Sequence, residues 1–148
     1  MLPPSVRVVL CVALFPVAFA GCDNSVAGPA TVAVTGTVSS GGTPLEGANV
    51  IFHPIVESGQ TLASQSVTDA QGRFEMSTHV GAGKFKPGIV PGKYAVAITK
   101  LDTASIATTL APPKDLLPKK YAHPKTSGLV AEVIEGQENE FEFALTGS

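Results

Sequence analysis

The sequence predicts an all-β domain in which about seven strands form a sandwich of two sheets. Short runs that alternate apolar and polar residues recur from Thr31 onward, and a period of two is typical of half-buried strands. The 148 residues include 15 glycines and 12 prolines, many of which stand between these runs, where they indicate turns. No convincing helical pattern follows Thr31. One sheet could not bury so many one-sided apolar faces, so we expect two sheets packed face to face.

Each expected strand has its own apolar face. The third run, residues 62–68, is the weakest because serine and glutamine dominate it, whereas Glu140 and Glu142 alternate cleanly with the apolar residues of the last run. The residues expected on the inward faces of the other six runs are Val32, Val34 and Val38; Ala48, Val50 and Phe52; Phe74 and Met76; Tyr94, Val96 and Ile98; Leu129, Ala131 and Val133; and Phe141, Phe143 and Leu145.

Turn residues between the runs support this order. Asp69-Ala70-Gln71-Gly72 should join the third and fourth strands as a hairpin, with Gly72 available for a positive φ. Pro91-Gly92 precedes the fifth strand. We expect the Tyr94 ring to enter the core while its hydroxyl hydrogen-bonds a nearby backbone group.

Composition and charge exclude some function classes. Ten Lys and Arg stand against twelve Asp and Glu, which gives a net charge of −2. A nucleic-acid partner is not expected, because the chain has no basic excess. Eight of the ten basic residues lie between Lys84 and Lys125, so the charge is nevertheless distributed unevenly.

The N-terminal stretch that ends at Cys22 has the pattern of an export signal. Arg7 precedes an uncharged run from Val8 to Ala20. That run is too short to span about 30 Å of hydrocarbon, which takes about 20 helical residues, but its length fits the apolar region of a secretory signal. Small residues and Cys22 follow the run.

This end of the chain resembles a bacterial lipoprotein. Ala20, Gly21 and Cys22 match the family's lipobox, while Phe19 stands where leucine is usual. The resemblance implies a signal peptide over residues 1–21 and acylation of Cys22. The lipid bilayer is then the first expected partner, and the protein is exported and lipid-anchored at the bacterial cell membrane or outer envelope.

The lipoprotein interpretation also explains the cysteine usage. Cys11 would be removed with the signal, and acylation would mask Cys22, so the folded domain would carry no thiol and no disulfide. Residues 22–30 would form the lipidated cysteine and a flexible tether, and residues 31–148 the domain. The alternative is ordinary cleavage after Ala20, which would release a soluble secreted protein.

Several segments in order resemble carboxypeptidase regulatory-like domains. The resemblance implies a transthyretin-like (prealbumin-like) β-sandwich of about seven strands and says little about function. Two further segments, 118–121 and 126–129, are similar to small bacterial lipoproteins that carry this domain alone. The segments that carry the main resemblance are Val34-Thr35-Gly36-Thr37-Val38, residues 43–50, residues 68–74 and Val90-Pro91-Gly92-Lys93-Tyr94.

Neither a catalytic residue nor a cofactor is expected. The three histidines, His53, His79 and His123, lack the spacing of a metal site. We expect His53 on the outward face of the second strand and the other two in loops. The chain has no Gly-x-Ser-x-Gly motif. The Gly81–Lys84 stretch lacks the further residues of a phosphate-binding loop. The alternative is a small enzyme or metal-binding protein whose site combines the three histidines with Arg73.

The segment from Leu101 to Gly128 is the most informative for function. It separates the fifth and sixth strands, and loops as long as this one in compact domains are usually functional or disordered. One hypothesis makes it a docking surface for an anionic envelope component or an envelope protein. The other has Leu117 and Tyr121 packing over the sandwich edge while the lysines stay in solvent. The candidate binding residues are Lys114, Lys119, Lys120, Tyr121 and Lys125.

The sequence therefore predicts an envelope lipoprotein that acts as a non-catalytic binding or structural module. A third hypothesis makes it a subunit of a larger envelope assembly.

Overall fold

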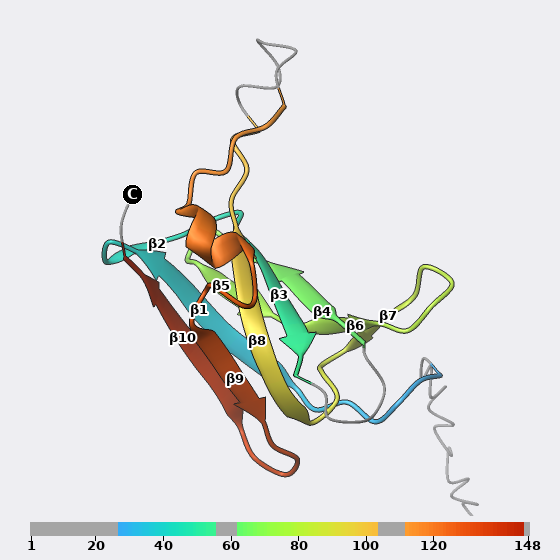
Figure 1. The fold of residues 1–148 in the computed structure, drawn as a ribbon. Coiled ribbons are helices and arrows are strands. Elements are labelled where there is room, and N and C mark those ends of the chain that lie inside the picture. Colours follow the sequence, from blue (N-terminus) through green and yellow to red (C-terminus); the bar gives the residue numbers. More distant parts are fainter. Residues whose placement is uncertain (1–26, 56–61, 104–111, 147–148) are drawn as a thin grey trace, which may run out of the picture.

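Two β-sheets packed face to face form the protein, as the computed structural model shows for residues 27–55, 62–103 and 112–146 (Figure 1). The all-β sandwich predicted from the sequence is confirmed. Within these residues the strands are β1 (Val34–Ser40), β2 (Thr43–Pro44), β3 (Asn49–Pro54), β4 (Ser64–Val67), β5 (Arg73–Glu75), β6 (Ser77–His79), β7 (Phe85–Pro87), β8 (Gly92–Thr99), β9 (Leu129–Val133) and β10 (Asn139–Leu145), with one 3₁₀ helix, η1 (Lys119–Ala122).

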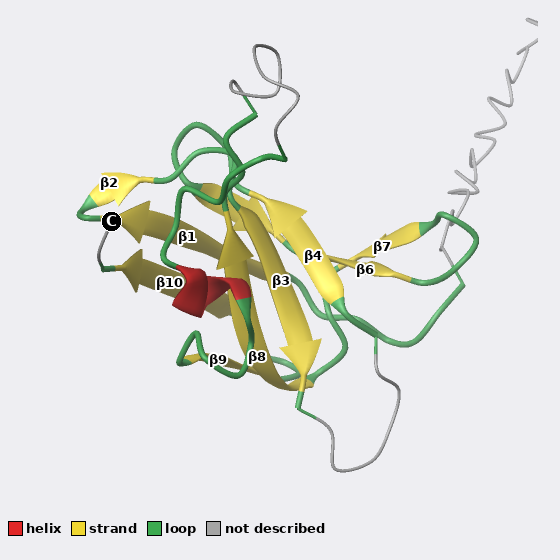
Figure 2. Cartoon of the chain, turned by 45° about the horizontal axis from the view of Figure 1, so that its top comes forward, coloured by secondary structure: helices red, strands yellow, loops and turns green. Residues whose placement is uncertain are grey.

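The smaller sheet is built around β1. Strand β10 pairs with β1 in parallel, so that Gly36 lies opposite Phe141, and β2 and β5 pair with β1 in antiparallel orientation. The larger sheet has the order β7-β6-β4-β3-β8-β9, and every neighbouring pair in it is antiparallel. Figure 2 shows β1 and β10 behind the layer formed by β3, β4 and β8.

All seven expected strands are present, and three more accompany them. The additional strands β2, β6 and β7 are only two or three residues long, too short to give an alternating pattern. His79, which the sequence placed in a loop, is the last residue of β6. The Gly81–Lys84 stretch is the turn of the β6–β7 hairpin, closed by a hydrogen bond from the Lys84 N–H to the Gly81 carbonyl (2.9 Å).

The hairpin expected at Asp69–Gly72 is wrong in one respect. The turn itself forms, with Gly72 at φ +71° and the Asp69 carboxylate accepting hydrogen bonds from the N–H groups of Gln71 and Arg73. However, β4 before the turn belongs to the larger sheet and β5 after it to the smaller one. The Val38 N–H donates to the Gly72 carbonyl at 2.8 Å, which holds the turn against β1 and directs β5 into the smaller sheet.

Phe52 is the centre of the core. Its side chain is fully buried on β3, and its ring centroid lies 5.8–6.4 Å from those of four other aromatic rings. Three of these contacts are edge-on, a geometry that aromatic quadrupoles favour. The four rings belong to Phe74, Tyr94, Phe141 and Phe143.

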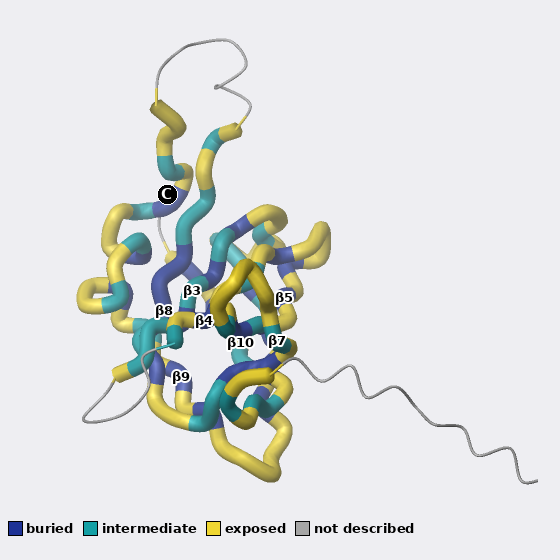
Figure 3. The backbone as a smooth tube through the Cα atoms, turned by 90° about the vertical axis from the view of Figure 1, so that its right-hand side faces the viewer, coloured by how far each residue is buried: buried dark blue, intermediate teal, exposed yellow. Residues whose placement is uncertain are grey.

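The long strand β8 connects this core to the rest of the larger sheet. Its residues Val96, Ala97 and Ile98 are all buried, and Figure 3 shows this stretch as a buried run, whereas the turns are mostly exposed. As expected, the Tyr94 ring is buried and its hydroxyl donates to the Val90 carbonyl at 2.6 Å. Burial raises the pKa of Tyr94 above its ordinary value.

Among the glycines of the described residues, Gly36 has the least room for a side chain. A Cβ placed there would clash with the Phe141 carbonyl oxygen and lie 2.6 Å from Cζ of Phe74. Gly36 therefore leaves the space that the Phe74 ring occupies, directly opposite it on β5.

We predict that Gly36→Ala lowers the free energy of unfolding by about 1–3 kcal/mol, the usual cost of an extra methyl group in a packed core. Urea unfolding should show a lower midpoint with an unchanged slope. Thr35→Ser is the matched control, because Thr35 is exposed on the other face of β1 and such changes stay within about 0.5 kcal/mol. Equal midpoints for Gly36→Ala and the wild type would contradict the argument.

Candidate functional site

The segment after β8 folds back on the strand that precedes it. Leu101 and Asp115 form an antiparallel bridge, and the Leu116 N–H donates to the Lys100 carbonyl at 2.7 Å. The Asp115 carboxylate accepts from the backbone N–H groups of Lys100 and Leu117, both at 3.0 Å. Asp115 is therefore committed to holding the returning chain beside the end of β8.

Leu117 and Tyr121 attach this segment to the sandwich. Both side chains are buried in the main hydrophobic core, and η1, which contains Tyr121, packs against β8. The Tyr121 hydroxyl accepts a hydrogen bond from the Thr146 N–H at 3.0 Å, which ties η1 to the chain just after β10. The predicted packing of Leu117 and Tyr121 is confirmed, and Tyr121 is an anchor of the segment.

The lysines of the segment remain in solvent. Lys114, Lys119, Lys120 and Lys125 are all exposed. The Lys120 ammonium lies 4.7 Å from the centroid of the Tyr121 ring, a distance at which a cation–π attraction operates.

A hollow of about 590 Å³ lies beside η1, and two of these lysines line it. We call it the η1 hollow. Lys114 and Lys120 supply its positive charge, and Leu117 and Pro118 supply apolar surface. Lys119 and Lys125 do not line it. The remaining lining residues are Asp115, Leu116 and Thr146. Two lysine ammonium groups and the Asp115 carboxylate line the hollow, which leaves a net formal positive charge to attract an anion, and two backbone N–H groups already hold the carboxylate in place.

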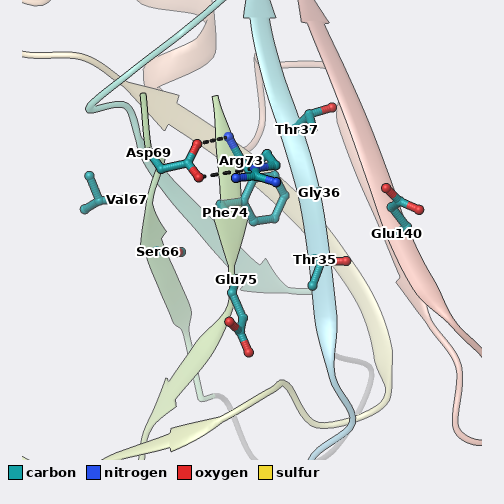
Figure 4. A pocket seen from close by; sticks show the side chains of 10 residues that line it. All are labelled: Thr35, Gly36, Thr37, Ser66, Val67, Asp69, Arg73, Phe74, Glu75 and Glu140. Carbon is teal, nitrogen blue, oxygen red and sulfur yellow. Dashed lines mark hydrogen bonds and ion pairs between the residues drawn. The ribbon is translucent and has the colours of Figure 1, made fainter. Parts of the chain in front are cut away.

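A second hollow, of about 520 Å³, lies over the smaller sheet and has a different character (Figure 4). Glu75 and Glu140 flank Thr35 on the neighbouring strands. The Arg73 guanidinium is engaged by Asp69, with Nε 3.3 Å from the carboxylate. Backbone hydrogen bonding from Arg73 holds the pKa of Asp69 below its ordinary value. This hollow could not be predicted from the sequence, because it depends on pairings of β1 that alternation does not reveal.

The residues of the alternative enzymatic site do not gather in one place. His53 lies on β3 and His79 on β6, with β4 between these strands. His123 follows η1, and Arg73 belongs to β5 in the other sheet. Within the described ranges, no three side chains of His, Cys, Asp or Glu are grouped so that they could hold a metal ion.

Comparisons with protein-family models, with curated proteins and with solved structures found no match for this chain. In the part of the chain that the structure describes, no helix has the length and apolar character needed to cross a membrane. The predicted signal peptide and Cys22 lie outside the described residues.

We predict that the two tyrosines of the chain titrate in separate steps. Hydrogen bonds from the Thr146 hydroxyl and N–H favour the phenolate and hold the pKa of Tyr121 below its ordinary value. Burial has the opposite effect on the pKa of Tyr94. Tyrosinate absorbance should therefore rise first from Tyr121 and then, at higher pH, from Tyr94.

Two variants assign these steps. Tyr121→Phe should remove the early step, and Thr146→Val, which lacks the hydroxyl but keeps the N–H, should move it toward higher pH. A single step in the wild type, or an early step that survives in Tyr121→Phe, would contradict the arrangement around η1.

Proposed function

We propose that this chain is an exported envelope lipoprotein, held to a bacterial membrane through acylated Cys22, that binds an anionic ligand in the η1 hollow. The observation that carries the binding role is the hollow itself, which Lys114 and Lys120 line together with Leu117 and Pro118. A pocket with mostly apolar walls and a few placed polar groups is the usual form of a small-molecule site. The ligand class is therefore an anion with an apolar portion.

The anchor is supported by the order of features at the N-terminus. The positive charge of Arg7, the uncharged run from Val8 to Ala20 and the small residues before Cys22 follow one another as in a lipoprotein signal. One acyl chain gives only marginal membrane binding, whereas two or more hold a protein stably.

The proposed family is the carboxypeptidase regulatory-like domains, and the placement of the resembling segments supports it. Val34-Thr35-Gly36-Thr37-Val38 lies in the central strand of the smaller sheet. Gly72 closes a turn, and Tyr94 begins the buried part of β8 with its hydroxyl bonded to Val90. A binding role is favoured over catalysis because the histidines and Arg73 lie on separate elements.

The proposed anchor can be tested by measuring the mass of the mature N-terminal peptide. The protein for this measurement is isolated from its native membrane fraction. The peptide should begin at Cys22 and carry the mass of a diacylglyceryl group, and the protein should partition with the membrane. An unmodified peptide that begins at Gly21 would instead indicate ordinary signal cleavage and a free thiol at Cys22, which would end the anchor proposal.

The hollow predicts selective binding of phenyl phosphate, which combines a dianion with an apolar ring. The double variant Lys114→Gln/Lys120→Gln should bind this probe about five- to thirtyfold more weakly, as expected for a loss of about 1–2 kcal/mol from two exposed charge interactions. Inorganic phosphate should bind more weakly than phenyl phosphate, because it leaves the apolar wall unused. Titration calorimetry on the mature protein in nonionic detergent measures these affinities.

Lys125→Gln is the matched control, because Lys125 is exposed in the same segment but does not line the hollow. It should bind phenyl phosphate as the wild type does. An equal loss in Lys125→Gln and in the double variant would mean that general charge, and not the hollow, attracts the probe.

A further inference from the structure

The chain enters the domain along the β6–β7 hairpin. The Lys86 ammonium donates to the Pro29 carbonyl at 2.8 Å, and the Thr31 hydroxyl donates to the Pro87 carbonyl at 2.8 Å. Gly28 packs so closely on Val80 that a Cβ at Gly28 would lie 2.9 Å from Cγ1 of Val80. The entering segment is therefore fixed to this hairpin from Gly28 onward.

The short distance along the chain from Cys22 limits where the hairpin can lie. Gly28 is the sixth residue after Cys22, and a fully extended chain spans at most about 3.3–3.6 Å per residue, or about 20 Å in all. This step rests on the proposed anchor: if Cys22 is acylated, the β6–β7 hairpin cannot lie farther than that from the membrane surface.

The exposed side chains of the hairpin are of the kinds that interact with a bilayer surface. Phe85 is 47% exposed on β7, the edge strand of the larger sheet, with the His79 ring 5.2 Å away. Lys84 is exposed beside it, and no acidic residue occurs from Met76 to Leu101. Apolar and aromatic side chains enter the interfacial region of a membrane, while lysines interact with anionic headgroups.

The shape of the hairpin agrees with this environment. Its turn contains Gly81, Ala82 and Gly83, which carry no bulky side chain that would hold the strand away from lipid. Figures 1 and 2 show the hairpin projecting from the body of the sandwich, beside the entering chain.

A protein partner fits the hairpin less well. Strand addition needs free backbone groups along an edge, but the Thr31 hydroxyl already donates to the Pro87 carbonyl of β7, and the Lys86 side chain holds the entering chain at Pro29. Pro87 also removes one N–H donor from this three-residue strand. The bilayer that holds Cys22 is therefore the occupant that the contacts and the chain length favour.

We propose that the β6–β7 hairpin (77–87) rests on the membrane that holds Cys22, with Phe85 in the interface and Lys84 against anionic headgroups. The η1 hollow then lies away from the hairpin along the larger sheet. Strand β8, on which η1 packs, is four strands from β7 in the sheet order, or about 19 Å at about 4.7–4.9 Å per strand.

The test uses tryptophan as a depth reporter, because the chain has none. Phe85→Trp reports on the hairpin, and Leu116→Trp is the matched control, since Leu116 is 51% exposed beside η1. Each mature full-length variant is reconstituted into phosphatidylcholine–phosphatidylglycerol vesicles that contain brominated acyl chains. The tryptophan of Phe85→Trp should shift to the blue and lose emission, whereas that of Leu116→Trp should do neither.

A second experiment tests the role of Lys84 by removing its charge. Adding Lys84→Gln to Phe85→Trp should reduce the quenching in vesicles that contain phosphatidylglycerol, and should change little in pure phosphatidylcholine. Equal effects in both vesicle compositions would overturn the assignment of Lys84 to anionic headgroups.

The N-terminal peptide mass is measured on the same preparations, so the failure of the hairpin proposal can be distinguished from the failure of the anchor proposal. Acylated protein with an unquenched Phe85→Trp, or with equal quenching at both reporters, overturns the hairpin proposal and leaves the anchor in place. Unacylated protein that still floats with vesicles and is quenched at Phe85→Trp supports the hairpin and overturns the anchor. Unacylated protein that neither floats nor is quenched overturns both.

Discussion

The missing side chain at Gly36 is the constraint on which the packing of the sandwich depends. Gly36 lies on the central strand of the smaller sheet, with Phe74 opposite it on one side and Phe141 on the other. Only a residue without a Cβ lets the Phe74 ring lie over this strand, where it meets Phe52 of the facing sheet. Because protein interiors are as densely packed as organic crystals, a methyl group at this point would displace a ring that other rings hold in place. The two sheets are thus joined through an aromatic cluster, and the absence of a side chain at Gly36 provides the space that this cluster needs.

The sequence was a good guide to which residues face inward and a poor one to which strands are neighbours. Alternation is a local property, so it identified Phe143, Leu145 and Val96 as core residues, and all three are buried. The parallel pairing of β1 with β10 joins the first strand of the domain to its last, and no local pattern encodes that register. The Asp69–Gly72 turn illustrates the same limit, because its residues specify a tight turn but the contact of Gly72 with Val38 decides which sheet β5 joins.

The candidate site was predictable in position but not in detail. A long segment rich in lysine between two strands indicated where to look, and Leu117 and Tyr121 were identified as its packing residues. Which lysines gather depends on the fold of the segment: Asp115 holds the returning chain against Lys100, and this places Lys114 and Lys120 around one hollow while Lys119 and Lys125 stay outside it. The Asp115 carboxylate makes these hydrogen bonds with backbone N–H groups, and the sequence does not reveal which N–H groups a carboxylate will reach.

Three strand edges of the sandwich either carry charged side chains or lie beside the entering chain. Strand β10 is an edge strand, and its exposed Glu140 and Glu142 place charge where another strand would otherwise add. On β9, the opposite edge of the larger sheet from β7, Glu132 lies 3.8 Å from Lys93 of β8. The β7 edge is accompanied by the chain that enters from Cys22. The η1 hollow is a separate surface, lined by Lys114 and Lys120 together with Leu117 and Pro118, and none of the pairings at these edges covers it.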